Sequence, residues 1–201
     1  AMLVPVQYQR ILAHPAFAKY DLASFKAKLS TSAPLRAQIK ADCLARWPGR
    51  LIEIYGLTEG GTACTLEANL FPDKLHTVGK QGLGSEIVVL DEQGRVLPQG
   101  EVGELAGRAQ LMMKGYYKQA GKTRDLFWHD ADGRLFFKSG DMGRIDEDGF
   151  VVLLDRKKDM IISGGFNVYA ADMEVLLLKH LDVIDVAVIG MPSEQWGESP
   201  L

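Results

Sequence analysis

Apolar and polar positions in the first quarter of the chain predict helices followed by a strand. A proline opens residues 5–14 and another follows directly, which predicts a short helix. Apolar residues recur every three or four positions from Leu35 to Trp47, between two further prolines, and predict a second helix. The apolar run at 51–55 then predicts a strand. This succession is typical of one unit of a larger parallel sheet.

From Val78 onward, short apolar and β-branched runs alternate with turn residues, which predicts a small antiparallel barrel or sandwich. The acidic segment Asp-Glu-Asp-Gly at 146–149 lies between two such runs. It is predicted to be a hairpin tip, because Gly149 can supply the positive φ that the turn requires.

An abrupt change from apolar to charged residues follows that hairpin. The apolar arm 150–154 leads into the charged segment 155–159, which no buried strand could carry, since unpaired charges are expelled from cores. A second apolar run, 160–162, comes next. The pattern predicts two packed units joined by a solvated crossing that could act as a hinge.

The last part of the chain returns to helical periodicity. Residues 170–180 are predicted to form an amphipathic helix, with Met173, Leu176 and Leu177 on its apolar face, and 182–191 a strand. We therefore expect an α/β chain of three parts. These are the end of an αβ lobe (1–77), a small antiparallel β-barrel subdomain (78–157) and the start of a C-terminal α+β domain (158–201), which is expected to be truncated.

Composition narrows the function classes. The net charge of −3 and the pI near 5.8 argue against a nucleic-acid binder, which normally carries a basic face. Two cysteines, Cys43 and Cys64, are too few for a disulfide framework and lack zinc-site spacing, so a cytoplasmic, reducing compartment is expected. No run approaches the ~18 apolar residues of a membrane span, and no membrane span is expected.

The segment Tyr-Gly-Leu-Thr-Glu-Gly-Gly at 55–61 directly follows the predicted strand, where α/β sheets bind ligands. A threonine hydroxyl can donate to phosphate, a carboxylate can hold Mg²⁺ on phosphates, and an aromatic ring can stack on a base. The glycines would let a ligand approach the backbone. The alternative is an ordinary glycine turn.

Two further places carry candidate chemistry. Asp141, after Gly140, could accept both hydroxyls of a ribose, and Arg156 could reach the same ribose or a phosphate. The alternatives are a turn-capping aspartate and a surface arginine. The stretch 32–34 precedes a predicted helix and could serve as a cap or as a ligand surface. By contrast, 115–123 is one residue too long for a nucleotide phosphate loop.

The order and spacing of several motifs resemble the adenylate-forming superfamily, which includes acyl- and aryl-CoA synthetases, luciferases and the adenylation domains of peptide synthetases. These motifs are Y-G-L-T-E (55–59), G-D-x-G (140–143), D-G-F (148–150) and D-R-K-K-D-M-I-I-S-G-G-F-N-V-Y (155–169). The resemblance implies a ligase that activates a carboxylic acid with ATP and Mg²⁺. Coenzyme A would then displace AMP from the acyl-adenylate.

The resemblance also implies residue roles. It implies nucleotide contacts for several residues, with Tyr55 on the adenine: Ser32, Ala33, Pro34, Tyr55, Gly56, Asp141 and Arg156. Thr58 would contact the α-phosphate and Glu59 would hold the metal. Lys158 would be the hinge of the C-terminal domain. The remaining roles fall on two glycine-containing segments, one wall of the acyl pocket (Gly60, Gly61, Thr62) and the pantetheine tunnel (Gly164, Gly165, Phe166).

Two departures from the family pattern are the missing upstream phosphate loop and the missing lysine near the C-terminus, so little or no turnover is expected of this chain alone. The segments 166–174 and 188–200 resemble fatty-acyl and aryl-acid ligases and favour a CoA ligase. An amino-acid adenylation domain is one alternative. Another is a non-catalytic nucleotide-binding or interaction module, whose exposed apolar surface would favour self-association and leave a homo-oligomer open.

Overall fold

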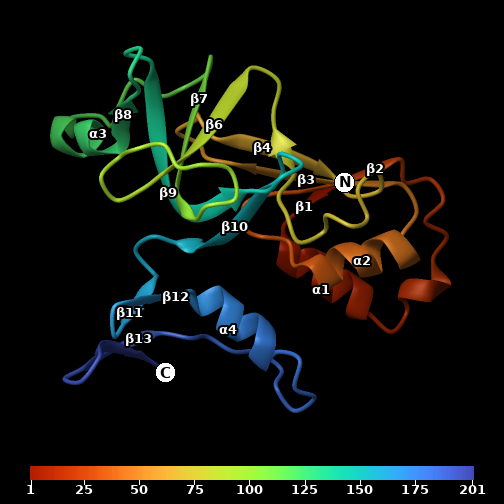
Figure 1. The fold of residues 1–201 in the computed structure, drawn as a ribbon. Coiled ribbons are helices and arrows are strands. Elements are labelled where there is room, and N and C mark those ends of the chain that lie inside the picture. Colours follow the sequence, from red (N-terminus) through yellow and green to blue (C-terminus); the bar gives the residue numbers. More distant parts are fainter.

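Three β-sheets follow one another along the chain in the computed structural model, which describes residues 1–201 (Figure 1). The first sheet has the order β1-β2-β3-β4-β5. Its strands are β1 (Met2–Leu3), β2 (Ala27–Ser30), β3 (Arg50–Gly56), β4 (Ala63–Glu67) and β5 (Lys80–Gln81). β1, β2 and β3 are parallel, whereas β4 and β5 are antiparallel to their neighbours.

Helices α1 (Pro5–Ala13) and α2 (Ala37–Arg46) pack on one face of this sheet, and a short 3-10 turn, η1 (Phe17–Lys19), follows α1 (Figure 1). The two predicted helices and the strand after them are thus confirmed. The helix α1 begins at Pro5, whose fixed φ suits a first turn.

Trp47 is the centre of the core beneath that sheet. Its ring lies 5.8, 5.7 and 5.2 Å from the rings of Tyr8, Phe17 and Phe25. Tilted and edge-to-face aromatic pairs of this kind contribute about 0.5–1.5 kcal/mol each beyond their buried area. The core therefore joins α1, η1 and the end of α2 into one layer.

The second sheet is antiparallel, with the order β10-β9-β7-β6 and β8 paired to β9. Its strands are β6 (Ser85–Leu90), β7 (Gly103–Ala109), β8 (Phe127–His129), β9 (Leu135–Ile145) and β10 (Val151–Arg156), and α3 (Ala120–Leu126) lies beside β8. The predicted hairpin tip at 146–149 joins β9 to β10, with Gly149 at φ +82°.

The predicted barrel does not close. Its edge strands, β6 and β10, do not pair with each other, so the sheet is a curled half-barrel. The first sheet fills the open side instead, since Cys64 and Val78 share a buried cluster with Ile87, Val89, Leu105 and Val151. Apolar side chains covered in this way do not need barrel closure to leave water.

Backbone hydrogen bonds join the first two sheets. The Val78 amide donates to the Val151 carbonyl (2.9 Å), and the Val151 amide donates to the Gly79 carbonyl (2.8 Å). Lys74 adds an ion pair to Asp146 in the β9–β10 hairpin (2.9 Å). The segment 74–79 therefore fixes the half-barrel against the first sheet.

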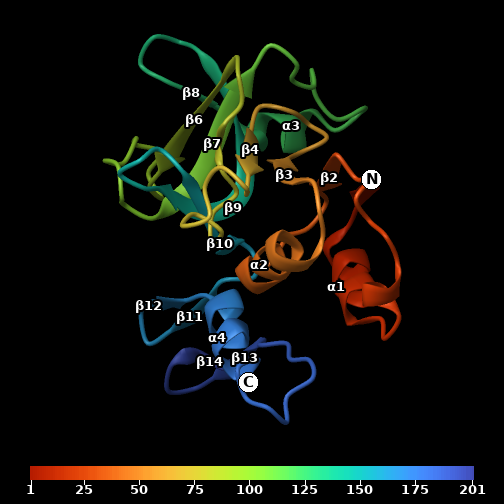
Figure 2. The same cartoon turned by 90° about the vertical axis from the view of Figure 1, so that its right-hand side faces the viewer.

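The third sheet has the order β12-β11-β14-β13 and lies below the others with α4 (Ala170–Leu177) beside it (Figure 2). Its strands are β11 (Ile161–Ser163), β12 (Phe166–Val168), β13 (Gly190–Ser193) and β14 (Gly197–Pro200). A small buried cluster of Ile161, Ala170 and Val188 holds the helix on the sheet.

Two predictions for this part need correction. The helix ends at Leu177 rather than His180, and of the predicted strand 182–191 only residues 190 and 191 are in a strand, which continues to Ser193. A strand needs a hydrogen-bonded neighbour, and β14 supplies one for Gly190–Ser193 but not for 182–188. None of the helices combines the length and the apolar character that a membrane crossing demands.

Candidate functional site

The carboxyl ends of β2 and β3 bring two candidate segments to the same edge of the first sheet. The strands are parallel and in register, with Ser30 opposite Glu53. The exposed stretch 32–34 leaves β2 at this edge, and Ser32 has φ +75°. The turn after β3 begins at this same edge. Open α/β sheets bind ligands at the carboxyl ends of their strands.

The turn after β3 presents Thr58 and Glu59. The Gly60 amide donates to the Leu57 carbonyl (3.0 Å), so these two residues are the central positions of a tight turn. The Thr58 side chain is exposed and Glu59 is half-buried. An exposed hydroxyl beside a fixed carboxylate suits contact with a phosphate and its cation.

Asp141 pairs with Arg156 of β10 but has no partner on β7, because two bulges meet at this point of β9. On β7, Glu104 pairs with Met142 and Ala106 with Lys138, so three residues of β9, 139–141, oppose Leu105 alone. β10 carries one extra residue of its own between Leu153 and Asp155. Bulges commonly re-aim a side chain next to an active site.

The bulge directs Asp141 to Tyr55 on the other sheet. The Tyr55 hydroxyl donates to Asp141 Oδ2 at 2.6 Å, across 86 positions of sequence. Burial raises the pKa of Tyr55 well above its ordinary value, and the neighbouring carboxylate of Asp141 raises it further. The tyrosine thus stays protonated and keeps donating. Arg156 Nε lies 3.7 Å from the other oxygen, Oδ1.

Ser139 and Gly140 hold this arrangement in place. The Ser139 hydroxyl donates to the Leu105 carbonyl (2.8 Å) and accepts from the Asp141 amide (3.0 Å). Gly140 has φ +74°, and an added Cβ would meet no atom within 4 Å. Its glycine is therefore required by backbone conformation rather than by space.

Sequence reasoning missed a tyrosine that contacts Glu59. The Tyr116 hydroxyl donates to Glu59 Oε1 at 2.7 Å, and this hydrogen bond raises the pKa of Tyr116. The Met113 amide also donates to the Glu59 carbonyl (2.8 Å). The sequence Gly-Tyr-Tyr at 115–117 could have drawn attention to Tyr116. The segment 115–123 was compared only with the phosphate-loop pattern, which says nothing about a contact with Glu59.

The three residues predicted for the acyl pocket pack closely against neighbouring backbone. A Cβ on Gly61 would lie 2.7 Å from the Gly107 carbonyl oxygen, and one on Gly60 would lie 2.1 Å from that of Leu111. Thr62 is buried, and its hydroxyl has no hydrogen-bond partner. Backbones approach so closely here that larger side chains would separate the two sheets.

The predicted tunnel residues lie apart from this site, whereas the predicted hinge residue follows Lys157, whose amide donates to the Gly140 carbonyl (2.8 Å). Lys158 is exposed in the turn between β10 and β11, with Nζ 3.9 Å from Asp159 Oδ1. Gly164 and Gly165, both at positive φ, form the β11–β12 hairpin turn, and Phe166 after them is exposed. In both views this hairpin is remote from β3 and β4 (Figures 1 and 2).

A model of the family described as "AMP-binding enzyme" matches residues 1–117, more than half of the chain. The chain belongs to the AMP-binding enzyme family. The curated relatives in this family include a medium/long-chain-fatty-acid–CoA ligase, FadD8, of Mycobacterium tuberculosis, 34% identical over 98% of this chain. A feruloyl-CoA synthase of Amycolatopsis sp. is 35% identical over 97% of it. The chain spans 34% and 39% of the length of these two relatives.

Solved AMP-binding enzymes share this fold. The amide bond synthetase McbA of Marinactinospora thermotolerans matches 99% of this chain and 40% of its own, with a TM-score of 0.86 and 31% identity. The o-succinylbenzoate-CoA synthetase MenE of Bacillus subtilis, solved with ATP and magnesium, matches the same shares with a TM-score of 0.83 and 28% identity. The mixed α/β architecture with a half-barrel is thus part of the fold of this family.

Glu59 fits a divalent cation held jointly with a nucleotide. Tyr116 engages only Oε1. No group of three or more His, Cys, Asp or Glu side chains is placed to form a metal cage. A cation at Glu59 would therefore take its other ligands from phosphate oxygens and water, which is the binding mode typical of Mg²⁺.

Proposed function

We propose that this chain provides the adenylate-binding part of an AMP-forming carboxylic acid–CoA ligase. The observation that carries the proposal is the hydrogen bond between Tyr55 and Asp141. It joins an aromatic ring at the end of β3 to a carboxylate on the bulge of β9. A group suited to stack on a base and a group suited to bind a ribose are thus held side by side. The whole ligase reaction is part of this proposal.

Adenosine would bind at the join between the two sheets. The Tyr55 ring would stack on the adenine beside Gly56, and the exposed stretch 32–34 would form the other wall. Asp141 Oδ1, which Tyr55 leaves free, would accept from the ribose hydroxyls. Arg156 Nε lies 3.7 Å from that oxygen, so its guanidinium is close enough to reach the ribose as well.

The phosphates would then lie over the turn of residues 57–60. The Thr58 hydroxyl would donate to the α-phosphate, and Glu59 would hold Mg²⁺. When bound, Mg²⁺ would neutralise charge on the polyphosphate. The substrate carboxylate attacks the α-phosphorus, pyrophosphate leaves, and the thiol of coenzyme A then displaces AMP from the acyl-adenylate. Positioning and charge neutralisation suffice, so no side chain of this site needs to be a nucleophile.

The thiol step would require the β11–β12 hairpin to approach this site. The exposed turn that contains Lys158 is the proposed pivot, because it joins β10 to β11 outside both sheets. On its half-barrel side Lys157 forms an ion pair with Glu104 (2.7 Å), and across it the Ala171 amide donates to Asp155 (3.3 Å). After rotation, Gly164, Gly165 and Phe166 would line the pantetheine path.

The proposed acid is a fatty or aryl acid rather than an amino acid. The relatives named above support this, since one is named for fatty acids and another for ferulic acid. The residues Gly60, Gly61 and Thr62 would form one wall of the acyl site. A fatty-acyl and an aryl adenylate analogue should both bind more tightly than an aminoacyl adenylate analogue. Tightest binding of the aminoacyl analogue would favour an amino-acid adenylation domain.

Calorimetric titration with a non-hydrolysable acyl-adenylate analogue tests the nucleotide site. Asp141→Asn should weaken binding about 10- to 100-fold, the loss expected for hydrogen bonds to a charged group. Asp132→Asn is the matched control, because the Asp132 side chain is 80% exposed in a distant turn and should leave affinity unchanged. Equal affinity of the wild type and Asp141→Asn would overturn the proposal.

A further inference from the structure

Glu59 is attached to the segment 112–116 by two hydrogen bonds. The Tyr116 hydroxyl donates to Glu59 Oε1 (2.7 Å), and the Met113 amide donates to the Glu59 carbonyl (2.8 Å) as part of an isolated β-bridge between Gly60 and Met112. Only the first of these hydrogen bonds acts on the carboxylate itself. It therefore orients the carboxylate, whereas the second fixes the backbone.

The direction of the Tyr116 hydrogen bond matters for cation binding. A phenol donates its single proton to Oε1, which leaves Oε2 and its lone pairs for another partner. A carboxylate that is already hydrogen-bonded on one oxygen loses less freedom when it binds a cation. Partners of this kind around metal ligands commonly change metal affinity about 10- to 100-fold when they are removed.

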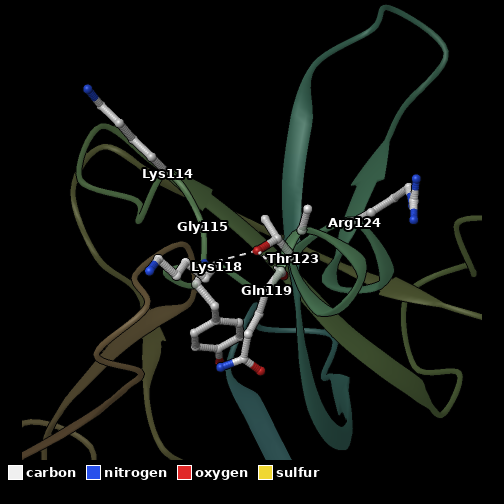
Figure 3. A pocket seen from close by; sticks show the side chains of 8 residues that line it. Lys114, Gly115, Lys118, Gln119, Thr123 and Arg124 are labelled. Atoms are coloured by element: carbon white, nitrogen blue, oxygen red, sulfur yellow. Dashed lines mark hydrogen bonds between the residues drawn. The ribbon is translucent and has the colours of Figure 1, made fainter.

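The backbone around Tyr116 is fixed by Thr123 in α3. The Tyr116 amide donates to Thr123 Oγ1 (2.9 Å), which in turn donates to the Gln119 carbonyl (3.0 Å) (Figure 3). Gly115 permits this approach, because a Cβ there would lie 2.7 Å from Thr123 Cγ2. The tyrosine therefore extends toward Glu59 from a backbone position that is hydrogen-bonded to α3.

The basic residues around the same segment do not offer a competing explanation. Lys114, Lys118 and Arg124 border a hollow of about 600 Å³, but their side chains point away from one another (Figure 3). A phosphate site requires donors that converge on the anion. The feature of this segment that is directed to the candidate site is therefore the hydroxyl of Tyr116.

We propose that Tyr116 is a positioning residue, which holds the Glu59 carboxylate in the orientation that binds the divalent cation of a cation–nucleotide complex. The inference rests on the proposed function, because it takes Glu59 as the cation ligand. It assigns Tyr116 no contact with the nucleotide and no chemical step.

The test compares four forms of the chain by calorimetric titration with ATP, once with Mg²⁺ and once with EDTA. They are the wild type, Glu59→Gln, Tyr116→Phe and Tyr117→Phe. The last is the matched control, since Tyr117 is the neighbouring tyrosine and is 84% exposed. Titration with Mn²⁺, followed by the loss of its free-ion magnetic resonance signal, reports cation affinity in the presence of ATP without any turnover.

Tyr116→Phe should weaken Mn²⁺ binding and the Mg²⁺-dependent gain in ATP affinity about 10- to 100-fold, with ATP affinity in EDTA unchanged. Tyr117→Phe should match the wild type. If Glu59→Gln removes the cation dependence but Tyr116→Phe keeps it, the positioning role is wrong and the metal assignment stands. Equal cation dependence in the wild type and Glu59→Gln would refute the metal assignment and this inference with it. Equal weakening by Tyr116→Phe in Mg²⁺ and EDTA would indicate a structural role only.

Discussion

Replacing Lys40 with methionine removes one partner of a buried ion pair beneath the candidate site. Lys40 and Glu53 contact each other with side chains only 2% and 3% exposed. Lys40 Nζ also donates to the Thr77 carbonyl (2.7 Å), and Glu53 Oε1 accepts from the Leu35 amide (2.9 Å). The pair therefore links α2 and β3 to the backbone at Leu35 and at Thr77.

Lys40→Met should lower the free energy of unfolding by about 3–5 kcal/mol, because Glu53 would keep a buried and uncompensated charge. Burial already raises the pKa of Glu53, and Lys40 opposes that shift. Without Lys40 the folded-state pKa rises further above the unfolded one. A carboxyl group whose pKa is raised in the folded state stabilises the fold at low pH, and this stabilisation is lost as the pH rises. The loss of unfolding free energy in Lys40→Met should therefore be smaller at pH 4.5 than at pH 8.

Urea unfolding followed by tryptophan fluorescence measures the loss, since Trp47 lies in the adjoining core. Lys40→Met/Glu53→Leu is the informative companion. It removes both charges and should cost about 1–3 kcal/mol less than the sum of the two single variants. If Lys40→Met loses under about 1 kcal/mol, or if the effects of the two substitutions are additive, Lys40 does not compensate a buried charge on Glu53.

Three further predictions concern the join between the sheets and the last sheet. Burial alone would raise the pKa of Asp146, but hydrogen bonds from Lys74 and from backbone amides lower it. Its contribution to stability should thus be present above the ordinary carboxyl pKa of 3.8 and lost as pH falls below it. Asp146→Asn should therefore flatten acid unfolding, and parallel acid-unfolding curves would contradict this. Gly140→Ala should lower the free energy of unfolding in urea by about 1–2 kcal/mol, because alanine is strained at φ +74°. An unchanged urea midpoint would contradict the need for a positive φ at this position. Leu181 and Ile184 are 99% and 95% exposed, so light scattering should detect concentration-dependent self-association, reduced by Leu181→Gln/Ile184→Gln and not by a surface change elsewhere.

The helices α1 and α2 and the strand β3 were predictable because their signals are local. Prolines mark the ends of α1, apolar spacing marks α2, and a short apolar run marks β3. The hairpin at 146–149 follows from its turn residues in the same way. The prediction of a strand over 182–191 was largely wrong. Alternation of apolar and polar residues indicates which segment suits a strand, but pairing with β14 determines which residues form one.

The site was predictable only as separate motifs. Resemblance pointed to Tyr55 and Asp141 as residues of one site, but not to the direct hydrogen bond, which depends on two bulges and on the docking of two sheets. Tyr116 was missed because its partner is 57 positions away and no local spacing links them. The half-barrel was expected to close because no strand pattern reveals that Cys64 and Val78 cover its open side.

A crystal structure of this chain grown with AMP would test the proposed nucleotide site most directly. We predict the ribose hydroxyls on the Asp141 carboxylate, the adenine against the Tyr55 ring, and the phosphate at the turn that carries Thr58. Density for AMP at another surface, or an ordered Tyr55–Asp141 pair with no nucleotide at saturating AMP, would contradict it.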